Sequence, residues 1–404
     1  MRVVCPARRI EVNLSDMLPP RRTLRVAAWV LGSVVVAAPL YAKPPPPTPQ
    51  ELEFAETLKQ PNAWFTERLK APPETVDGQT MHPKMQWICE TVIRTKPANR
   101  PTLAQRYSTA AGAAESRALV ERNWNIKTKV TQEMAKTEDR QIEGPGGPLK
   151  IRIYTPRTTE KGPLPGLVYF HGGGWFFGSI EAVDRAVRLI ANEAKVMVIS
   201  ADYRMTPEYK FPAAQDDAYA IFRWVQANAR KLGMDPARIG IGGDSAGGQM
   251  SAVTSLRLRD RHEPMPVYML LYYPAVDMNM NYRSWELFGE GYGLDRSFAD
   301  GMLSVYFAGV DLKSQDASPL HAASLAGLPP AIIATPGFDP LRDSGRVFAD
   351  KLMAQGIPVI YKNYPSLMHG FMQQSGGVDD AEQASNETAR WFGEKVRTVP
   401  IAKR

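Results

Sequence analysis

The chain reads Ile239-Gly240-Ile241-Gly242-Gly243-Asp244-Ser245-Ala246-Gly247 where an apolar run passes directly into a Gly-x-Ser-x-Gly pentad. The apolar run predicts a buried strand, and residues 247–259 have the spacing of a helix. Between them the chain must reverse sharply. Glycines two residues before and two residues after Ser245 remove the Cβ atoms that would clash in such a turn. This strand, turn and helix would push the serine hydroxyl out into a pocket.

Apolar runs alternate with segments of helical spacing on both sides of the pentad. Continuous apolar runs suit strands that are buried on both faces. We expect strands at residues 123–130, 149–154, 164–170, 196–200, 239–242, 267–272, 331–335 and 359–364, and helices near 181–194, 213–231, 247–259 and 342–355. Repeated strand-helix units build a mostly parallel sheet. The predicted fold class is therefore α/β, with about eight strands flanked by helices.

A second glycine-rich run, His171-Gly172-Gly173-Gly174, follows the expected strand at 164–170. Backbone without side chains can approach a substrate oxygen closely, and its N–H groups can stabilise the oxyanion of a tetrahedral intermediate. Together with Ser245, this run predicts an acyl-transfer site.

A serine hydroxyl needs a base, and only three histidines follow Ser245: His262, His321 and His369. His262 lies in a charged segment typical of a solvated helix end, and no strand precedes His321. His369 follows the expected strand at 359–364, on a loop at the carboxyl end where ligands meet open α/β sheets. We therefore expect His369 to be the base.

The acid that orients this base should lie between Ser245 and His369 in the chain. Asp339 follows the strand at 331–335 and so occupies the equivalent loop one strand earlier. Asp343 is the alternative, although a carboxylate at the start of the next helix is also explained by the helix dipole. We favour Asp339.

Five motifs in this order resemble the hormone-sensitive lipase family of α/β-hydrolases, in its Gly-Asp-Ser-Ala-Gly subgroup of bacterial carboxylesterases. They are His171-Gly172-Gly173-Gly174-Trp175, Asp202-Tyr203-Arg204 with Pro207-Glu208 and Phe211-Pro212-Ala213-Ala214, Gly243-Asp244-Ser245-Ala246-Gly247-Gly248, Asp339-Pro340-Leu341-Arg342-Asp343, and His369-Gly370-Phe371. The resemblance covers about residues 120–397. It departs from the family at Ser344, where Glu is common, and in a longer segment before residue 120.

The resemblance implies an α/β-hydrolase fold with a helical cap and a role for each matched residue. Ser245 would be the nucleophile, His369 the general base and acid, and Asp339 its orienting carboxylate. The oxyanion would be held by the backbone N–H groups of Gly173, Gly174 and Ala246.

Other polar and aromatic residues in the motifs have structural explanations as well. Asp202, Arg204 and Glu208 are expected to form a buried ion pair that holds their loop, rather than to act in catalysis. Trp175, Phe176 and Phe177 follow the glycines and are candidates for a substrate-pocket wall, or for plain core.

The first residues are typical of an export signal. Arg21, Arg22 and Arg25 precede an apolar run of about thirteen residues, shorter than the roughly twenty of a membrane anchor, and a cleavage point is expected after Ala42. Residues 1–42 carry +4 of the +7 net charge, which removes the support for nucleic-acid binding. Cys5 lies in this region, so Cys89 would be left without a disulfide partner.

The expected organisation is a signal peptide at 1–42, a proline-rich linker at 43–50, an N-terminal helical cap segment at 51–120 and a catalytic domain at 121–397, with a cap insertion at about 282–310. The product would be exported, periplasmic or secreted, without a stable membrane anchor, as a monomer or homodimer.

The predicted function is hydrolysis of small to medium, fairly apolar carboxylic esters through an acyl-enzyme on Ser245. A lactone, carbamate or amide hydrolase with the same triad, or a non-catalytic small-ligand binding protein on this scaffold, are the alternatives. No metal or nucleotide cofactor is expected, because the glycine spacing fits neither a dinucleotide fingerprint nor a P-loop and no His-Glu-x-x-His occurs.

Overall fold

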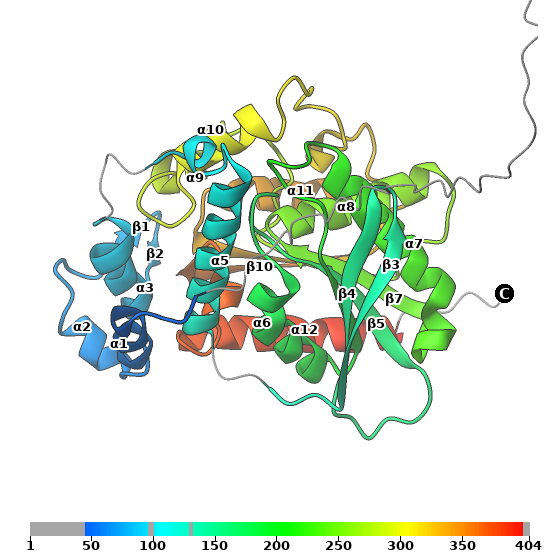
Figure 1. The fold of residues 1–404 in the computed structure, drawn as a ribbon, viewed down its shortest axis with the longest axis horizontal. Coiled ribbons are helices and arrows are strands. Elements are labelled where there is room, and N and C mark those ends of the chain that lie inside the picture. The colour runs from blue at the N-terminus through cyan, green and yellow to red at the C-terminus, as the bar shows by residue number, and fades with distance from the viewer. Residues whose placement is uncertain (1–44, 96–100, 129–131, 399–404) are drawn as a thin grey trace, which may run out of the picture. The chain divides into compact units, whose positions relative to one another are not determined.

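A twisted eight-stranded sheet lies at the centre of the described chain in this computed structural model, which describes residues 45–95, 101–128 and 132–398 (Figure 1). Its strand order is β10-β9-β8-β7-β5-β6-β4-β3. The strands are β3 (Lys136–Gly144), β4 (Gly147–Thr155), β5 (Leu164–Phe170), β6 (Met197–Ala201), β7 (Met234–Asp244), β8 (Met269–Tyr272), β9 (Ala331–Phe338) and β10 (Val359–Met368). The pairs β3–β4 and β4–β6 are antiparallel, and the other neighbours are parallel. The mostly parallel α/β sheet predicted from the sequence is confirmed.

Helices cover both faces of the sheet. One face carries α6 (Ile180–Ala194) and α12 (Asp379–Thr398), and the other carries α7 (Ala213–Leu232), α8 (Ala246–Asp260) and α11 (Arg342–Ala354). The residues of β5 alternate between these layers: Leu167 packs into the core under α6 and α12, and Val168 into the opposite core. All of these side chains are buried, which is why the strands read as continuous apolar runs.

Two expectations about the elements were wrong or incomplete. Residues 123–127 belong to the helix α5 (Ala110–Lys127), because the period-two pattern there is only the end of a longer helix that Thr109 caps. The outer strand β3 was missed. Its sequence, Lys-Thr-Glu-Asp-Arg-Gln-Ile-Glu-Gly, is almost entirely polar since it forms an edge of the sheet with most side chains partly or fully exposed.

Short elements precede the sheet and interrupt it (Figure 1). Before it come α1 (Pro49–Thr57), α2 (Asn62–Thr66), the hairpin β1 (Thr75–Val76) and β2 (Gln79–Thr80), α3 (Pro83–Ile88), the π-helical turn η1 (Cys89–Ile93) and α4 (Leu103–Arg106). Between β8 and β9 come α9 (Arg283–Phe288), α10 (Arg296–Val305) and the turn η2 (Pro319–His321), and η3 (Phe371–Gln374) follows β10. The predicted segment at 51–120 contains α2, α3, η1 and α4, and the predicted insertion at 282–310 contains α9 and α10. The helix α1 begins at Pro49, inside the predicted linker, and η2 and η3 lie outside both segments.

The predicted signal peptide at 1–42 lies outside the described residues. Within the part of the chain that is described, no helix is long and apolar enough to span a bilayer. The described residues all belong to one compact unit, 41–404.

Candidate active site

Ser245 sits at the sharp turn between β7, which ends at Asp244, and α8, which begins at Ala246. Its backbone has φ 53° and ψ −114°, a combination that non-glycine residues rarely adopt. The chain passes so close to β5 that a Cβ on Gly247 would lie 1.9 Å from the carbonyl oxygen of Phe170. The glycine of the pentad is therefore required by space, as the sequence pattern indicated.

His369 and Asp339 come from two loops at the carboxyl ends of neighbouring strands, β10 and β9. The Nε2 atom of His369 lies 3.2 Å from Ser245 Oγ, and its Nδ1 atom lies 2.8 Å from Asp339 Oδ2. Asp339 is wholly buried, and its second oxygen accepts a hydrogen bond from the backbone N–H of Leu341 at 2.8 Å. The structure thus joins the three predicted side chains in one hydrogen-bonded chain.

The alternative residues lie elsewhere. Asp343 accepts hydrogen bonds from the N–H of Ser284 at 2.9 Å and from the guanidinium of Arg342, at the first turn of α11. His262 is exposed just after α8. His321 is bonded to Asp277, 3.0 Å from its Oδ1 atom. These contacts explain each residue without a role beside Ser245.

The glycine-rich run after β5 forms a loop beside the turn at Ser245. Gly173 has φ +117°, and a Cβ there would lie 2.0 Å from the carbonyl oxygen of Phe177. Within the described chain, no acceptor takes a hydrogen bond from the N–H groups of Gly173 and Gly174. Ala246, the third predicted donor, is the first residue of α8, where N–H groups have no partner inside the helix.

His171, at the start of the run, is wholly buried and stacks on the ring of Tyr203 at 4.4 Å. Burial lowers its pKa to about 4, so the ring is neutral at pH 7. The Tyr203 hydroxyl donates to the carbonyl of His171 at 2.8 Å. This neutral pair fixes the loop without adding a charge.

Asp244 is a structural residue of the site that the sequence analysis did not identify. Its buried carboxylate accepts three hydrogen bonds, from Tyr169 Oη at 2.8 Å, from Gly172 N–H at 3.0 Å and from Gln373 Nε2 at 3.0 Å. It thereby ties together β5, the glycine-rich loop and the segment after His369. Burial raises the pKa of this carboxyl, and the three donors oppose that effect.

A small apolar pocket opens beside Ser245. Its lining combines the glycine-rich loop and the turn at Ser245 with the segment from 280 to 303. The lining residues are Gly174, Trp175, Ser245, Ala246, Ala275, Asp277, Met278, Met280, Trp285, Leu294, Phe298, Ala299, Met302, Leu303 and Leu341. Asp277 is the charged residue in this lining, and its carboxylate already has two hydrogen-bond partners, the Tyr282 hydroxyl at 2.6 Å and His321. The wall is therefore almost wholly apolar.

The three aromatic residues predicted as a pocket wall take different positions. Trp175 lines the pocket and stacks on Tyr306, with ring centroids 5.0 Å apart. Phe176 is absent from the lining, and its buried ring packs edge-on against Tyr107. Phe177 is also absent, although it packs against Phe298, which does line the pocket.

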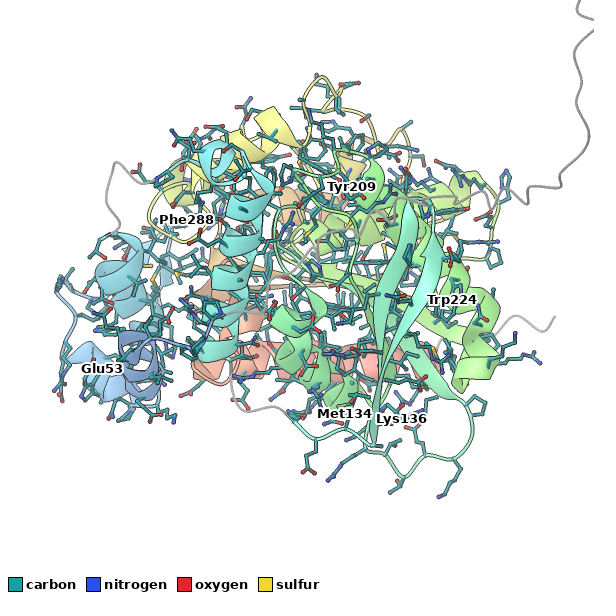
Figure 2. All side chains as sticks on the ribbon, viewed as in Figure 1. Glu53, Met134, Lys136, Tyr209, Trp224 and Phe288 are labelled. Carbon is teal, nitrogen blue, oxygen red and sulfur yellow. The ribbon has the colours of Figure 1, made fainter. Side chains whose placement is uncertain are left out.

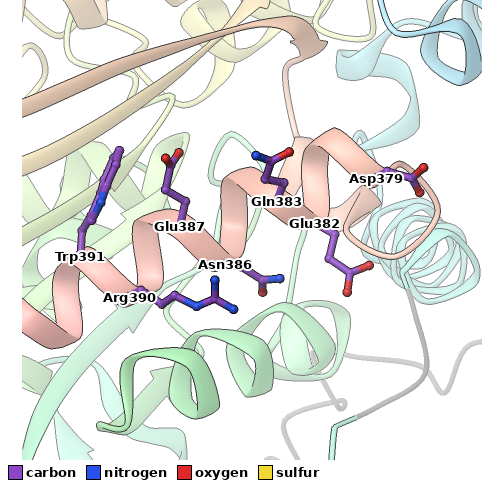
Figure 3. A pocket seen from close by; sticks show the side chains of 7 residues that line it. All are labelled: Asp379, Glu382, Gln383, Asn386, Glu387, Arg390 and Trp391. Atoms are coloured by element: carbon purple, nitrogen blue, oxygen red, sulfur yellow. The ribbon is translucent and has the colours of Figure 1, made fainter.

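A larger and more open hollow runs along α12 and is lined by polar side chains and Trp391 (Figure 3). It contains no serine, cysteine or histidine. Among the described residues, no three or more His, Cys, Asp or Glu side chains form a group that could hold a metal ion. The pocket beside Ser245, by contrast, joins a cavity to a reactive side chain.

The charged residues after β6 hold their loop through partners on neighbouring helices. Arg204 forms a bidentate ion pair with buried Asp217, and Glu208 pairs with Arg117, 2.7 Å apart. Asp202 accepts from the N–H of Ile180, and burial raises its pKa to about 7. The expectation that buried ion pairs hold this loop is therefore confirmed for Arg204 and Glu208, whose partners lie on α7 and α5.

The fold and the site define an α/β-hydrolase. Residues 167–373 match a protein family whose description is alpha/beta hydrolase fold, and the chain belongs to that family.

The chain also resembles individual members. It is 39% identical over 313 residues to the carboxylic ester hydrolase LipN of Mycobacterium tuberculosis, covering 75% of this chain and 80% of that protein. It is 36% identical over 259 residues to the arylesterase of Saccharolobus solfataricus, covering 61% and 83%. The solved ester-hydrolase EH1AB1 from the metagenome of Lake Arreo, complexed with a derivative of bipyridine phosphonate, has a TM-score of 0.73 and 36% identity, covering 79% of this chain and all of that one.

Proposed function

We propose that this chain is a serine carboxylic-ester hydrolase that acts on small to medium, fairly apolar esters. The observation that carries the proposal is the hydrogen-bonded chain from Ser245 Oγ through His369 to Asp339, with distances of 3.2 and 2.8 Å. The relatives named above as ester hydrolases agree with it.

In the proposed mechanism Ser245 Oγ attacks the ester carbonyl while its proton passes to Nε2 of His369. Asp339 accepts from Nδ1–H, keeps Nε2 available as the base and stabilises the imidazolium that forms. As the tetrahedral intermediate collapses, Nε2–H protonates the departing alkoxide and leaves an acyl group on Ser245. Water then gives a proton to Nε2 of His369 as it attacks the acyl carbon. When this second intermediate collapses, His369 returns the proton to Ser245 Oγ and the acid is released.

The negative oxygen of each tetrahedral intermediate would be held by the N–H groups of Gly173, Gly174 and Ala246. Those of the two glycines have no competing acceptor among the described residues. Asp244, through its bond to Gly172 N–H, fixes the loop that presents them. Preorganised donors of this kind typically contribute about 10²- to 10³-fold each in turnover.

The pocket supports a preference for small apolar substrate groups. Its lining is mostly aliphatic and aromatic, and the segment from 280 to 303 contributes much of that lining. A charged acyl group would lose its hydration there without gaining a free partner.

The test is hydrolysis of p-nitrophenyl acetate, butyrate and octanoate by the purified protein. We expect turnover that is fastest for one of the two shorter chains, and Ser245→Ala should reduce it at least about 10³-fold. The binding-protein alternative would be favoured if the wild-type protein binds these esters without turnover and is no more active than Ser245→Ala. Matched lactone, carbamate and amide substrates distinguish the remaining chemistries of the same triad.

We also propose that the chain is exported and functions as a monomer or homodimer without a membrane anchor. The support is the basic cluster and short apolar run before Ala42. N-terminal sequencing of the protein recovered from its host should begin at Lys43, whereas a product that still contains Arg21 would contradict export by cleavage. Light scattering after size exclusion measures the oligomeric state.

A further inference from the structure

One N-terminal segment, residues 74–89, contacts both loops that carry Asp339 and His369. It contains the hairpin β1–β2 and the helix α3, and it lies beside β10, the edge strand of the sheet (Figure 1). The two loops are more than 240 residues away in the chain, so these contacts are made only in the folded protein.

The hairpin turn sets the direction of Gln79. Asp77 and Gly78 have φ 55° and 75°, the two positive values that a type I′ turn requires. The turn is followed at once by Gln79, and the register pairs Val76 with it. A tight two-residue turn allows little slippage, so the position of Gln79 is well defined.

The side chain of Gln79 bridges the strands that lead to the acid and to the base. Its Oε1 accepts from Asn363 Nδ2 on β10 at 2.6 Å, and its Nε2 donates to the carbonyl of Gly337 at 3.4 Å. Gly337 lies two residues before Asp339, and a Cβ there would come within 2.5 Å of Gln79 Oε1. The amide therefore fills the space against the backbone of the acid loop.

A second contact holds the other side of the acid loop. Asp77 accepts from Arg342 Nη2 at 2.8 Å, three residues after Asp339. Arg342 also donates to Asp343 and to the carbonyl of Gly337. The loop with Asp339 is thus bonded to the hairpin on both sides of the carboxylate.

The same segment holds the backbone just before His369. The pairing of β10 with β9 is interrupted between Tyr364 and Met368, which leaves backbone groups without ladder partners. There the carbonyl of Ser366 accepts from His82 N–H at 2.9 Å, and Met368 N–H donates to Met85 Sδ at 3.2 Å. The segment thus supplies hydrogen-bond partners where the pairing of β10 with β9 is interrupted, up to the residue before His369.

The segment is also bonded to the cap. Glu74 forms a bidentate ion pair with Arg94, at 2.8 and 2.9 Å, and accepts from the hydroxyl of Tyr292. The Tyr292 ring stacks on Phe338, the residue before Asp339, and Phe288 of α9 packs against both rings. Figure 2 labels Phe288 among the side chains of the whole molecule. The segment thus connects the cap insertion with the acid loop.

From these contacts we propose that residues 74–89 brace the Asp339 and His369 loops at hydrogen-bonding distance, with Gln79 as the central positioning residue. Gln79 is not among the residues that line the pocket, so it acts on the rate through the acid and the base. This inference rests on the proposed hydrolase function.

The experiment compares wild type, Gln79→Ala and Gln79→Glu at a temperature where circular dichroism shows all three folded. Glu keeps the acceptor for Asn363 and loses the donor to Gly337, so it should fall between the other two. We expect Gln79→Ala to lower kcat for p-nitrophenyl butyrate about tenfold with KM within about twofold, since small displacements of catalytic groups cost rate more than binding. The matched control is Thr75→Ala, which removes the exposed hydroxyl pair with Thr80 in the same hairpin and should leave kcat unchanged.

A second readout does not depend on turnover. The downfield proton resonance of the His369 Nδ1–H that donates to Asp339 should broaden or shift in Gln79→Ala and stay in place in Thr75→Ala. An unchanged resonance together with kcat within twofold of wild type would overturn the brace. If the wild-type protein hydrolyses no ester, the proposed function fails, while the resonance still decides whether Gln79 positions the acid and the base.

Discussion

Replacing Asp244 by Ala removes the acceptor that ties three parts of the site together. The side chain is buried, so the donors on Tyr169, Gly172 and Gln373 would all be left without a partner. Each unsatisfied buried donor costs about 1 to 3 kcal/mol, and removal of a buried carboxylate returns part of its desolvation cost. We expect a net loss of about 3 kcal/mol in the free energy of unfolding.

Asp244→Ala should also lower the kcat of the protein that remains folded. Without its bond to Asp244, the N–H of Gly172 no longer fixes the loop that presents Gly173 and Gly174, and loss of one oxyanion donor costs about 10²-fold in kcat. The assay is urea unfolding followed by circular dichroism, with steady-state hydrolysis of p-nitrophenyl butyrate on the folded protein.

Asp244→Asn is the matched variant. The amide oxygen can keep the bonds from Tyr169 and Gly172, which both use Oδ1, and the Gln373 amide can rotate to face the new N–H donor. We expect it to lose about 1 kcal/mol and less than tenfold in kcat. An Asp244→Ala protein within 1 kcal/mol of wild type and within threefold in kcat would refute the argument.

Three further outcomes follow from the site. Gly174→Ala should lower kcat about 10²-fold, because its φ is +60° and the new Cβ would lie 2.8 Å from the Phe298 ring; unchanged kcat contradicts the role of this loop. Phe298→Ala should enlarge the pocket and raise the kcat/KM ratio of octanoate to butyrate about tenfold, and an unaltered ratio places the acyl chain elsewhere. Burial raises the pKa of Asp202 to about 7, so its contribution to stability is present below about pH 4 and is lost as the pH rises through 7. Asp202→Asn removes that loss, and its stability relative to wild type should increase by about 2 kcal/mol from pH 5 to pH 8 in urea unfolding; a constant difference would disprove the raised pKa.

Much of the site was predictable because its reactive residues lie in short local sequence motifs. Ser245, Asp339 and His369 each follow an apolar strand, and the parallel sheet brings the carboxyl ends of those strands to one edge. The glycines near Ser245 are required by backbone contacts that any sharp strand-to-helix turn would make. The strands that lead to the site and the reactive residues after them were therefore predicted together.

The contacts that hold the site were not predictable, because they join distant parts of the chain. Asp217 and Arg117 were unforeseen partners of Arg204 and Glu208, since a charge in sequence does not indicate which opposite charge will lie beside it. Gln79 reaches its partners across more than 250 residues. The polar strand β3 was missed for a related reason: an edge strand needs no apolar face when solvent covers much of it.

The most direct test of the account is to label the protein with an aryl alkylphosphonate, which leaves a covalent adduct on an activated serine, and to locate the adduct by peptide mass spectrometry. The account predicts one adduct per chain, on Ser245, formed at least about 10³-fold more slowly in His369→Ala. An adduct on another residue, or labelling of Ser245 at an equal rate without His369, would contradict the claim that this histidine activates this serine.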